Sequence, residues 1–186
     1  MNYKDLINRF QPKTQADIIQ KQNILSFLSL TGEEALLRSS AIAHMTATAL
    51  VFNENRDKIL MIHHNIFNTW ACVGGHADGN PDLLQLAFQE LAEETGIEAA
   101  YAITDEIQSL DILTVQAHMK NGLPVPNHLH LNATFALEAS DKTPYRIKAD
   151  ENSAVRWIPI VAMGNYCKED EFVAIYKKII NHVRTL

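Results

Sequence analysis

Hydrophobic and polar positions divide the chain into a helical N-terminal part and a longer part that mixes strands with helices. In residues 1–40, the apolar residues that fall near one helical face are Ile18, Ile19, Leu25 and Leu28. The Thr-Gly-Glu-Glu sequence that starts at Thr31 fits a capping box before another short helix. We therefore expect residues 1–40 to form a helical appendage and residues 41–186 to form the main domain.

From about His44 the pattern changes to short runs of β-branched and apolar residues. Two such runs, 46–52 and 58–63, flank the polar stretch 53–57 and predict a β-hairpin. Further strands are expected at 70–73, 112–119, 128–137 and 154–158. The loop 121–127 between two of these strands is placed where it could cover a cleft.

Two longer helices are expected within the main domain. Asn80 is a suitable N-cap residue, and Pro81 suits the first helical position. This helix should run to about Thr95, where Gly96 fits a left-handed C-terminal cap. The final helix, 169–184, places on one face Phe172, Ile175, Tyr176, Ile179 and Val183. The order of elements predicts an α+β fold with helices packed on a mixed sheet.

Composition and charge limit the classes of protein. The 186 residues, 47% of them hydrophobic, suit one folded domain with a small appendage. The net charge of -6 disfavours binding to a nucleic acid polymer or a membrane surface, but a divalent cation could still recruit a phosphate compound. Cys72 and Cys167 form no disulfide framework, and no signal peptide or membrane-spanning run is recognised. We expect a cytoplasmic protein.

The informative chemistry lies in the segment from Gly74 to Ile97. Glu90, Glu93 and Glu94 are spaced so that a helix places their carboxylates on one face. Three like charges so close repel one another, and Mg²⁺ takes carboxylate and phosphate oxygens together. Such a run alone is more typical of a solvated acidic face. Gly74 and Gly75 before the helix, and the stop at Gly96, favour a ligand site instead.

The same segment resembles the conserved box of the Nudix family. The positions that match at the family's spacing are Gly75, Glu90, Leu91, Glu93, Glu94, Gly96 and Ile97. Two positions depart, since Pro81 stands where the box has Glu and Gln89 stands where it has Arg. The resemblance extends over about residues 42–162. It implies a Nudix-type α/β/α sandwich with a mixed β-sheet, to which the N-terminal helices are added.

The resemblance also implies an activity and roles for individual residues. It indicates hydrolysis of a diphosphate linked to a nucleoside- or sugar-type group, with Mg²⁺ or Mn²⁺ as cofactor. Gly74 would offer its carbonyl to the metal, and Glu90, Glu93 and Glu94 would be ligands, one of which also activates water. An acidic residue before the Trp157 strand often joins them, and here Glu151 is the first choice and Asp150 the second.

Histidines are numerous for a chain of this length. His128 and His130 alternate with leucines, so both share one strand face with Asn132 and Thr134. A single histidine is more often a core or surface residue than a ligand, but such a face is a candidate lining for a substrate cleft. The candidate substrate-binding residues are His63, His64, His76, His128 and His130.

Two other functions remain as alternatives. Isopentenyl-diphosphate isomerases share the Nudix fold, but Gly74 stands at the position of their nucleophilic cysteine, which leaves only Cys72 nearby. The departures at Pro81 and Gln89 motivate a non-catalytic domain that senses a nucleotide or sugar diphosphate. Complete retention of the three glutamates favours the hydrolase. For the assembly, a homodimer is one option that the sequence does not decide.

Overall fold

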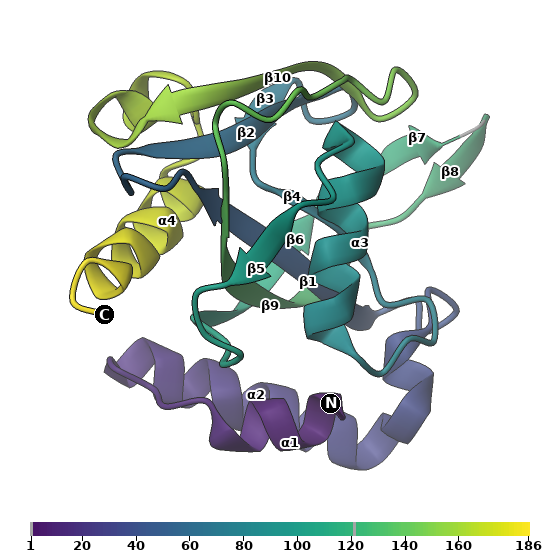
Figure 1. Ribbon diagram of the computed structural model, residues 1–186. Helices are drawn as coiled ribbons and strands as arrows, with labels where there is room; N and C mark the ends of the chain where they lie inside the picture. The colour runs from purple at the N-terminus through teal and green to yellow at the C-terminus, as the bar shows by residue number, and fades with distance from the viewer. Residues whose placement is uncertain (1, 121) are drawn as a thin grey trace.

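A mixed β-sheet forms the centre of the protein, and helices cover both of its faces (Figure 1). The computed structural model describes residues 2–120 and 122–186. The strands of the sheet are β1 (Ala43–Phe52), β2 (Lys58–His64), β3 (Thr69–Ala71), β4 (Val73–His76), β5 (Ala100–Ala102), β6 (Ser109–Val115), β9 (His128–Ala139) and β10 (Asn152–Pro159). They follow the order β10-β2-β1-β9-β5, while β3 pairs with β2, β4 with β1 and β6 with β9. β1 runs parallel to β9, and the other pairs are antiparallel.

The helices lie before, within and after this sheet in the sequence. They are α1 (Tyr3–Arg9), α2 (Gln15–Thr31), the 3₁₀ helix η1 (Gly32–Leu36), α3 (Leu83–Thr95), the 3₁₀ helix η2 (Ile160–Asn165) and α4 (Asp170–Val183). A small hairpin of β7 (His118–Lys120) and β8 (Leu123–Val125) projects from the body of the molecule (Figure 1). None of the described helices is long and apolar enough to cross a membrane.

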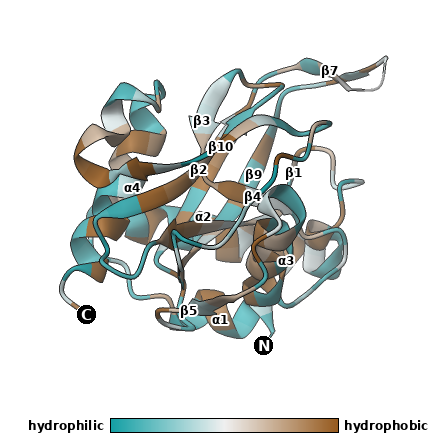
Figure 2. Ribbon diagram, turned by 45° about the horizontal axis from the view of Figure 1, so that its top comes forward, coloured by the Kyte–Doolittle hydropathy of each residue, from teal (hydrophilic) through white to brown (hydrophobic). Residues whose placement is uncertain are grey.

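Alternating residues of β1 show how the two faces of the sheet are used. Ala47 and Ala49 belong to a buried cluster that also contains the apolar residues of α3, whereas Leu50 and Phe52 belong to a second cluster with α4. Successive side chains of a strand point to opposite faces, so α3 and α4 cover opposite faces. Hydrophobic segments accordingly occur on the strands, on α3 and on α4 (Figure 2). The expected α+β sandwich is confirmed.

Strand pairing refines the expected strands. β1 pairs with β2 only near the turn, at Val51 with Leu60 and Phe52 with Ile59. The earlier part of β1 pairs with β4 and β9 instead. The strand expected at 70–73 is divided into β3 and β4, and the strand expected at 112–119 is divided into β6 and β7. Of the loop 121–127, Asn121 lies outside the described residues, and 123–125 form β8.

The start of α3 differs from the expectation. Asp82, not Asn80, is the N-cap, because its Oδ1 accepts a hydrogen bond of 3.1 Å from the Gln85 amide. Asn80 acts one step earlier, since its Oδ1 accepts from the Asp82 amide at 2.9 Å. The helix end was predicted correctly: Gly96 has a φ of 75° and caps the C-terminus in the left-handed conformation.

The N-terminal helices are present, but two local predictions about them were wrong. Thr31 makes no side-chain cap to η1, and the capping box lies at Thr14 with Asp17, at the start of α2. Ile18 and Ile19 are 38% and 48% exposed. The buried face of α2 is formed by Ile24 and Leu28, which join Leu6 and Ile7 of α1 in the cluster beneath α3.

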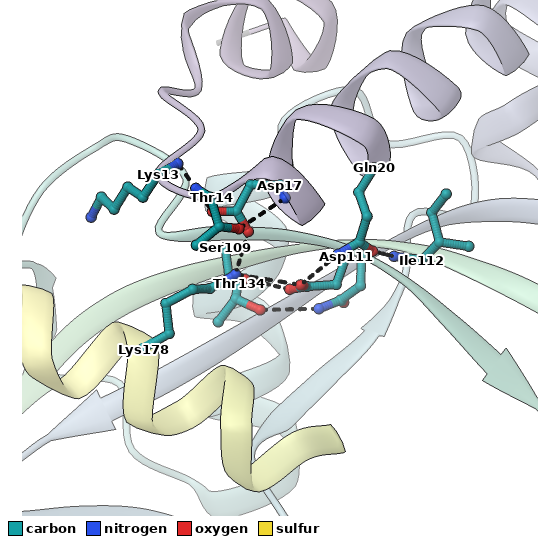
Figure 3. A network of polar contacts seen from close by, with 10 residues as sticks. Lys13, Thr14, Asp17, Gln20, Ser109, Asp111, Ile112, Thr134 and Lys178 are labelled. Atoms are coloured by element: carbon teal, nitrogen blue, oxygen red, sulfur yellow. Dashed lines mark hydrogen bonds and ion pairs between the residues drawn. The ribbon is translucent and has the colours of Figure 1, made fainter. Parts of the chain in front are cut away.

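A buried polar network connects α2 to the sheet and to α4 (Figure 3). The Nζ of Lys178 on α4 lies 2.9 Å from Asp17 and 3.6 Å from Asp111 of β6, and both carboxyl side chains are only 4% exposed. Gln20 of α2 accepts a hydrogen bond of 2.6 Å from the Ile112 amide. Lys178 thus places one positive charge between two carboxyl groups that come from distant parts of the chain.

Replacement of Lys178 by Met should therefore destabilise the protein by about 2 kcal/mol, because it leaves two buried carboxyl groups without their cation. We expect less than for a fully enclosed pair, since the Lys178 side chain is 25% exposed. Urea unfolding measures the change. Lys177→Met, at the exposed neighbouring position, is the control. A loss below about 0.5 kcal/mol for Lys178→Met would show that the network contributes no more than an ordinary surface contact.

Candidate functional site

Three carboxylates meet at the side of α3. Glu90 and Glu94 lie one turn apart on this helix, and Glu151 lies just before β10. One oxygen from each of the three lies within 4.8 Å of the others. Glu94 is 2% exposed, and its Oε1 accepts a hydrogen bond of 2.9 Å from the Gly74 amide. Helix packing against β4 therefore brings two of the predicted ligands to the predicted loop, and the residue just before β10 adds the third.

Burial affects the protonation of this carboxylate group. Desolvation, followed by repulsion from neighbouring carboxylates and offset in part by Lys148, raises the pKa of Glu90 to about 7. Desolvation also raises the pKa of Glu94 to about 8, although the Gly74 amide lowers it in part. Deprotonated oxygens gathered in a desolvated place are a suitable set of donors for a hard divalent cation, which would stabilise their charged forms. The residues present therefore fit Mg²⁺ or Mn²⁺.

Glu93 and Asp150 lie outside this group of three. The Glu93 side chain is 59% exposed, and its Oε2 lies 3.3 Å from Lys148 Nζ. Lys148 also lies 3.0 Å from Glu151 Oε1, so one ammonium group bridges both carboxylates. Asp150 is exposed. Of the two loop acids considered from the sequence, Glu151 is the one that the fold brings to Glu90 and Glu94.

The two glycines of β4 are required by close packing. A Cβ atom at Gly75 would lie 1.9 Å from Glu90 Oε1, and one at Gly74 would lie 2.6 Å from the Ala47 carbonyl oxygen. Neither glycine has the positive φ that would require it for backbone reasons. Their missing side chains let α3 and β1 approach β4 from its two sides, which places the carboxylates against the strand.

A pocket of about 420 Å³ opens beside the same strand. Its walls include Gly74 and Gly75, together with residues of β1 and β9. Asn132 of β9 organises part of the wall, because its Oδ1 accepts hydrogen bonds of 2.9 Å from the hydroxyls of Thr46 and Thr48. The Asn132 amide group also donates to Thr134 at 3.0 Å. The polar face predicted for β9 therefore does line a cavity.

The predicted histidines separate into two sets. His76, His128 and His130 gather in the pocket, where His44 of β1 joins them. His64 also lines the pocket, whereas His63 is not among its lining residues and lies 2.9 Å from the Ser153 hydroxyl. Burial, and after it the neighbouring histidines, lower the pKa of His130 to about 2. This imidazole is therefore neutral at physiological pH.

Comparison with known proteins identifies the family of this fold and site. The sequence model of the NUDIX domain matches residues 43–183. The chain belongs to the Nudix family. Membership confirms the expected fold, and it confirms the prediction that the protein is a hydrolase acting on pyrophosphate bonds. No curated protein sequence matches the chain.

Solved structures with the Nudix fold agree with this assignment. An Ap4A hydrolase of C. elegans in a binary complex has a TM-score of 0.57 at 14% identity, over 76% of this chain and 98% of its own. The dihydroneopterin triphosphate pyrophosphohydrolase of E. coli has a TM-score of 0.55 at 17% identity, over 74% and 95%. The NUDIX domain of Shewanella oneidensis NrtR, solved with ADP ribose, has a TM-score of 0.53 at 16% identity, over 75% and 87%. At these identities the likeness shows the fold alone.

At the two positions that depart from the Nudix box, Pro81 and Gln89, other hydrogen bonds hold the loop before α3. Gln89 Oε1 accepts a hydrogen bond of 3.2 Å from the side-chain amide of Asn80, which connects α3 to the preceding loop. The Pro81 carbonyl accepts a hydrogen bond of 3.0 Å from the Tyr3 amide at the start of α1. A neutral amide pair and the N-terminal helix therefore hold the loop where the family box places a charged pair.

Sequence reasoning missed three polar residues at the site: His44, Arg38 and Lys148. His44 could have been found, because it alternates with Thr46 and Thr48 on one face of β1. Arg38 lines the pocket and forms a two-point ion pair with Asp78, at 2.6 and 2.7 Å. For Arg38 and Lys148 the local sequence holds no signal, since both reach the site only through the tertiary fold.

Cys72 lies between β3 and β4 and is 7% exposed. Burial raises the pKa of its thiol well above the ordinary value. Its backbone amide donates a hydrogen bond of 3.2 Å to the Tyr176 hydroxyl. A thiol that stays protonated is a poor nucleophile, so the site supports the interpretation of Cys72 as a buried strand-end residue.

Proposed function

We propose that this Nudix protein is a Mg²⁺- or Mn²⁺-dependent pyrophosphohydrolase of a nucleoside- or sugar-type diphosphate. The observation that carries the proposal is the group of Glu90, Glu94 and Glu151, in which one oxygen from each residue lies within 4.8 Å of the others, beside Gly74. In this proposal the three carboxylates and the Gly74 carbonyl hold the metal. Glu93 completes the set once its ion pair with Lys148 is exchanged for the cation.

Each protein group then has a physical task in hydrolysis. A bound divalent cation would polarise the phosphate oxygens and lower the pKa of a bound water. One of Glu90, Glu93 and Glu94 would accept the proton from that water, as general bases do within hydrogen-bond reach. The short separation between α3 and β4 keeps the carboxylates in place. Lys148, which lies beside Glu93 and Glu151, would offset the negative charge of these two carboxylates.

The pocket is where we place the group joined to the diphosphate, because its wall includes Gly74 and Gly75, which lie beside the carboxylates. It is lined by polar groups on β1 and β9 and by the aromatic side chains of Phe67 and Phe172, which suits a phosphate joined to a ring-bearing group. The candidate histidines His64, His76, His128 and His130 line it, and His63 does not. Proteins of the same fold act on or bind nucleotide-type compounds. Among them are an Ap4A hydrolase and the NUDIX domain of NrtR, which was solved with ADP ribose. These neighbours support a nucleoside diphosphate derivative as the first substrate to test.

The test is release of phosphate or nucleotide from a panel of nucleoside, dinucleoside and sugar diphosphates, with and without Mg²⁺ or Mn²⁺. We expect release that requires the metal. Tight binding without release from any compound would contradict the hydrolase and favour the non-catalytic sensing domain. Isomerisation of a prenyl diphosphate without hydrolysis would replace it with the isomerase, against which the buried Cys72 thiol already argues.

The setting that we propose is a reducing compartment such as the cytoplasm. Cys72 and Cys167 are both buried free thiols, which are kept in that form where disulfides do not persist. The substrate is a small molecule, and the acidic charge of the chain disfavours nucleic acid polymers.

Restoring the family's charged pair, by Pro81→Glu together with Gln89→Arg, should change turnover by less than about threefold, a difference of under 1 kcal/mol. The reason is that Asn80 and the N-terminal helix already hold this loop. Steady-state rates of the double variant and the unchanged protein are compared under saturating metal. A rate increase of tenfold or more would mean that the hydrogen bonds of Asn80 and Tyr3 do not hold the loop well enough. Pro81 and Gln89 would then limit catalysis.

A further inference from the structure

Four histidines from three neighbouring strands converge in the pocket, apart from the carboxylate group. One ring nitrogen from each of His44, His76, His128 and His130 lies within 4.8 Å of the others. The strand pairing explains the convergence. His44 is opposite His130 in the parallel pair of β1 and β9, and His76 is opposite Thr46 in the antiparallel pair of β1 and β4. His128 lies two residues before His130, on the same face of β9.

Backbone carbonyls determine which nitrogen of two of these rings is available. His44 Nδ1 lies 3.1 Å from the Ser40 carbonyl, and His128 Nδ1 lies 2.9 Å from the Pro126 carbonyl. A carbonyl can only accept a hydrogen bond, so Nδ1 carries the proton in both rings. The lone pair is then on Nε2, which faces the cluster. This arrangement, with Nδ1 donating to a carbonyl, is the usual outer support of a metal-bound histidine.

The inner nitrogens of the cluster lie close together. His44 Nε2 is a buried atom with no hydrogen-bond partner among the described residues, in a side chain that is 4% exposed. His128 Nε2 and His130 Nε2 lie 3.2 Å apart, within hydrogen-bond distance, and an ion bound between them would replace that hydrogen bond. Two nitrogens bound tetrahedrally to one ion at about 2.0–2.1 Å lie roughly 3.3–3.4 Å apart. The unpartnered His44 Nε2 within a cluster of four ring nitrogens, together with this spacing, fits a bound cation.

We propose that His44, His76, His128 and His130 bind a divalent transition-metal ion, with Zn²⁺ as the reference ion. Imidazole nitrogen suits Zn²⁺, Co²⁺, Ni²⁺ and Fe²⁺, whereas Mg²⁺ selects oxygen. Tetrahedral ligands at these bond lengths lie about 3.3–3.4 Å apart, so a pair of nitrogens at the 4.8 Å limit must close by up to about 1.4 Å, which small movements of both rings provide. This site is separate from the carboxylates, because Gly75 turns toward Glu90 and the next residue, His76, turns toward the opposite face.

The donor set also indicates what such an ion does in the pocket. Four neutral imidazoles leave the double positive charge of the ion uncompensated, whereas the carboxylate group neutralises its own cation. An anionic part of a ligand in the pocket would therefore be attracted to the histidine-bound ion. The inference concerns metal binding at these four residues and stands independently of the proposed hydrolysis.

Titration of the metal-free, full-length protein with Zn²⁺ and with Co²⁺ tests the site. Excess Mg²⁺ is present, so that the carboxylates are occupied, and calorimetry and the visible spectrum of Co²⁺ report binding. We expect one equivalent to bind. His44→Gln and His130→Gln should each weaken binding by more than roughly 100-fold, because even loss of a residue that only orients a ligand weakens binding 10- to 100-fold. Glu94→Gln and His182→Gln, which lie outside the cluster, should bind as the unchanged protein does.

Three results would overturn the proposal. They are the absence of stoichiometric binding, binding that persists in both histidine variants, and binding that is lost in Glu94→Gln. If a histidine variant does not fold, X-ray absorption of the unchanged protein loaded with one equivalent of Zn²⁺ decides the question. At least three imidazole ligands are expected there, and a shell dominated by oxygen would refute the site.

Discussion

Glu94→Gln is expected to reduce metal-dependent turnover at least about 100-fold while the protein stays folded. Glu94 is the most buried member of the carboxylate group, at 2% exposure, and its Oε1 is held by the Gly74 amide at 2.9 Å. The substitution removes the negative charge from the proposed metal site. A metal ion supplies several kcal/mol of transition-state stabilisation, and each 1.36 kcal/mol corresponds to a factor of ten in rate.

Retention of the fold follows from the same environment. The glutamine amide has the size of the carboxyl group, and its oxygen can still accept from Gly74. Burial already favours an uncharged group here, since it raises the pKa of Glu94 to about 8. The control is Glu98→Gln, an exposed acidic position just beyond α3, which should leave turnover unchanged. Near-normal turnover in Glu94→Gln, at every metal concentration, would mean that the metal is held elsewhere.

Gly75→Ala should reduce turnover by roughly tenfold or more and weaken binding of the activating metal. The new Cβ would lie 1.9 Å from Glu90 Oε1 and 2.3 Å from its carboxyl carbon, so the Glu90 side chain must move. Because the clash is with the end of a flexible side chain, the strand itself can stay in place. A ligand displaced by even 1 Å has a large effect on rate, since catalysis depends on near-correct geometry.

The measurement for Gly75→Ala is turnover as a function of Mg²⁺ and Mn²⁺ concentration, together with thermal unfolding. Gly164→Ala is the matched control, because a Cβ atom at Gly164 would meet no atom of the described residues within 4 Å. We expect Gly164→Ala to behave as the unchanged protein in both measurements. A Gly75→Ala protein with an unchanged metal dependence would show that Glu90 is not a ligand in the working enzyme.

The two ligand groups of the site also suggest why β4 carries Gly-Gly-His. Gly74 and Gly75 admit the carboxylates from α3, and His76 then faces the pocket with the other histidines. Two chemically different donor sets are thereby connected by a single short strand. Variants at Gly75 and at His76 should for this reason affect different metals, oxygen-preferring ions in the first case and nitrogen-preferring ions in the second.

Local spacing was sufficient to predict the elements that carry the carboxylates. Glu90 and Glu94 lie on one helical face because α-helical periodicity brings residues four apart together. Gly96 ends that helix in the left-handed conformation, which its missing side chain permits. The alternation of His128, His130 and Asn132 correctly indicated one polar strand face, which lines the pocket. All of these features depend on residues within a few positions of one another.

Errors in the sequence-based prediction arose where several local solutions compete. Asn80 and Asp82 are both good capping residues, and in the structure Asp82 accepts from the Gln85 amide while Asn80 accepts from the Asp82 amide. The apolar face of α2 was misplaced, because Ile24 and Leu28 bury against α1 and the sheet while Ile18 and Ile19 stay exposed. Propensity and periodicity are weak guides where tertiary contacts select the buried face.

The spacing of residues within one short segment was enough to predict helix α3, its carboxylates, its glycines and the class of chemistry. Which distant groups join them depends on how the whole chain folds. Glu151 reaches Glu90 and Glu94 across more than fifty residues of chain, and His44 meets His130 through a parallel strand pair. Such pairings depend on the register of the whole sheet and on burial of both its faces, and no local pattern of residues specifies them.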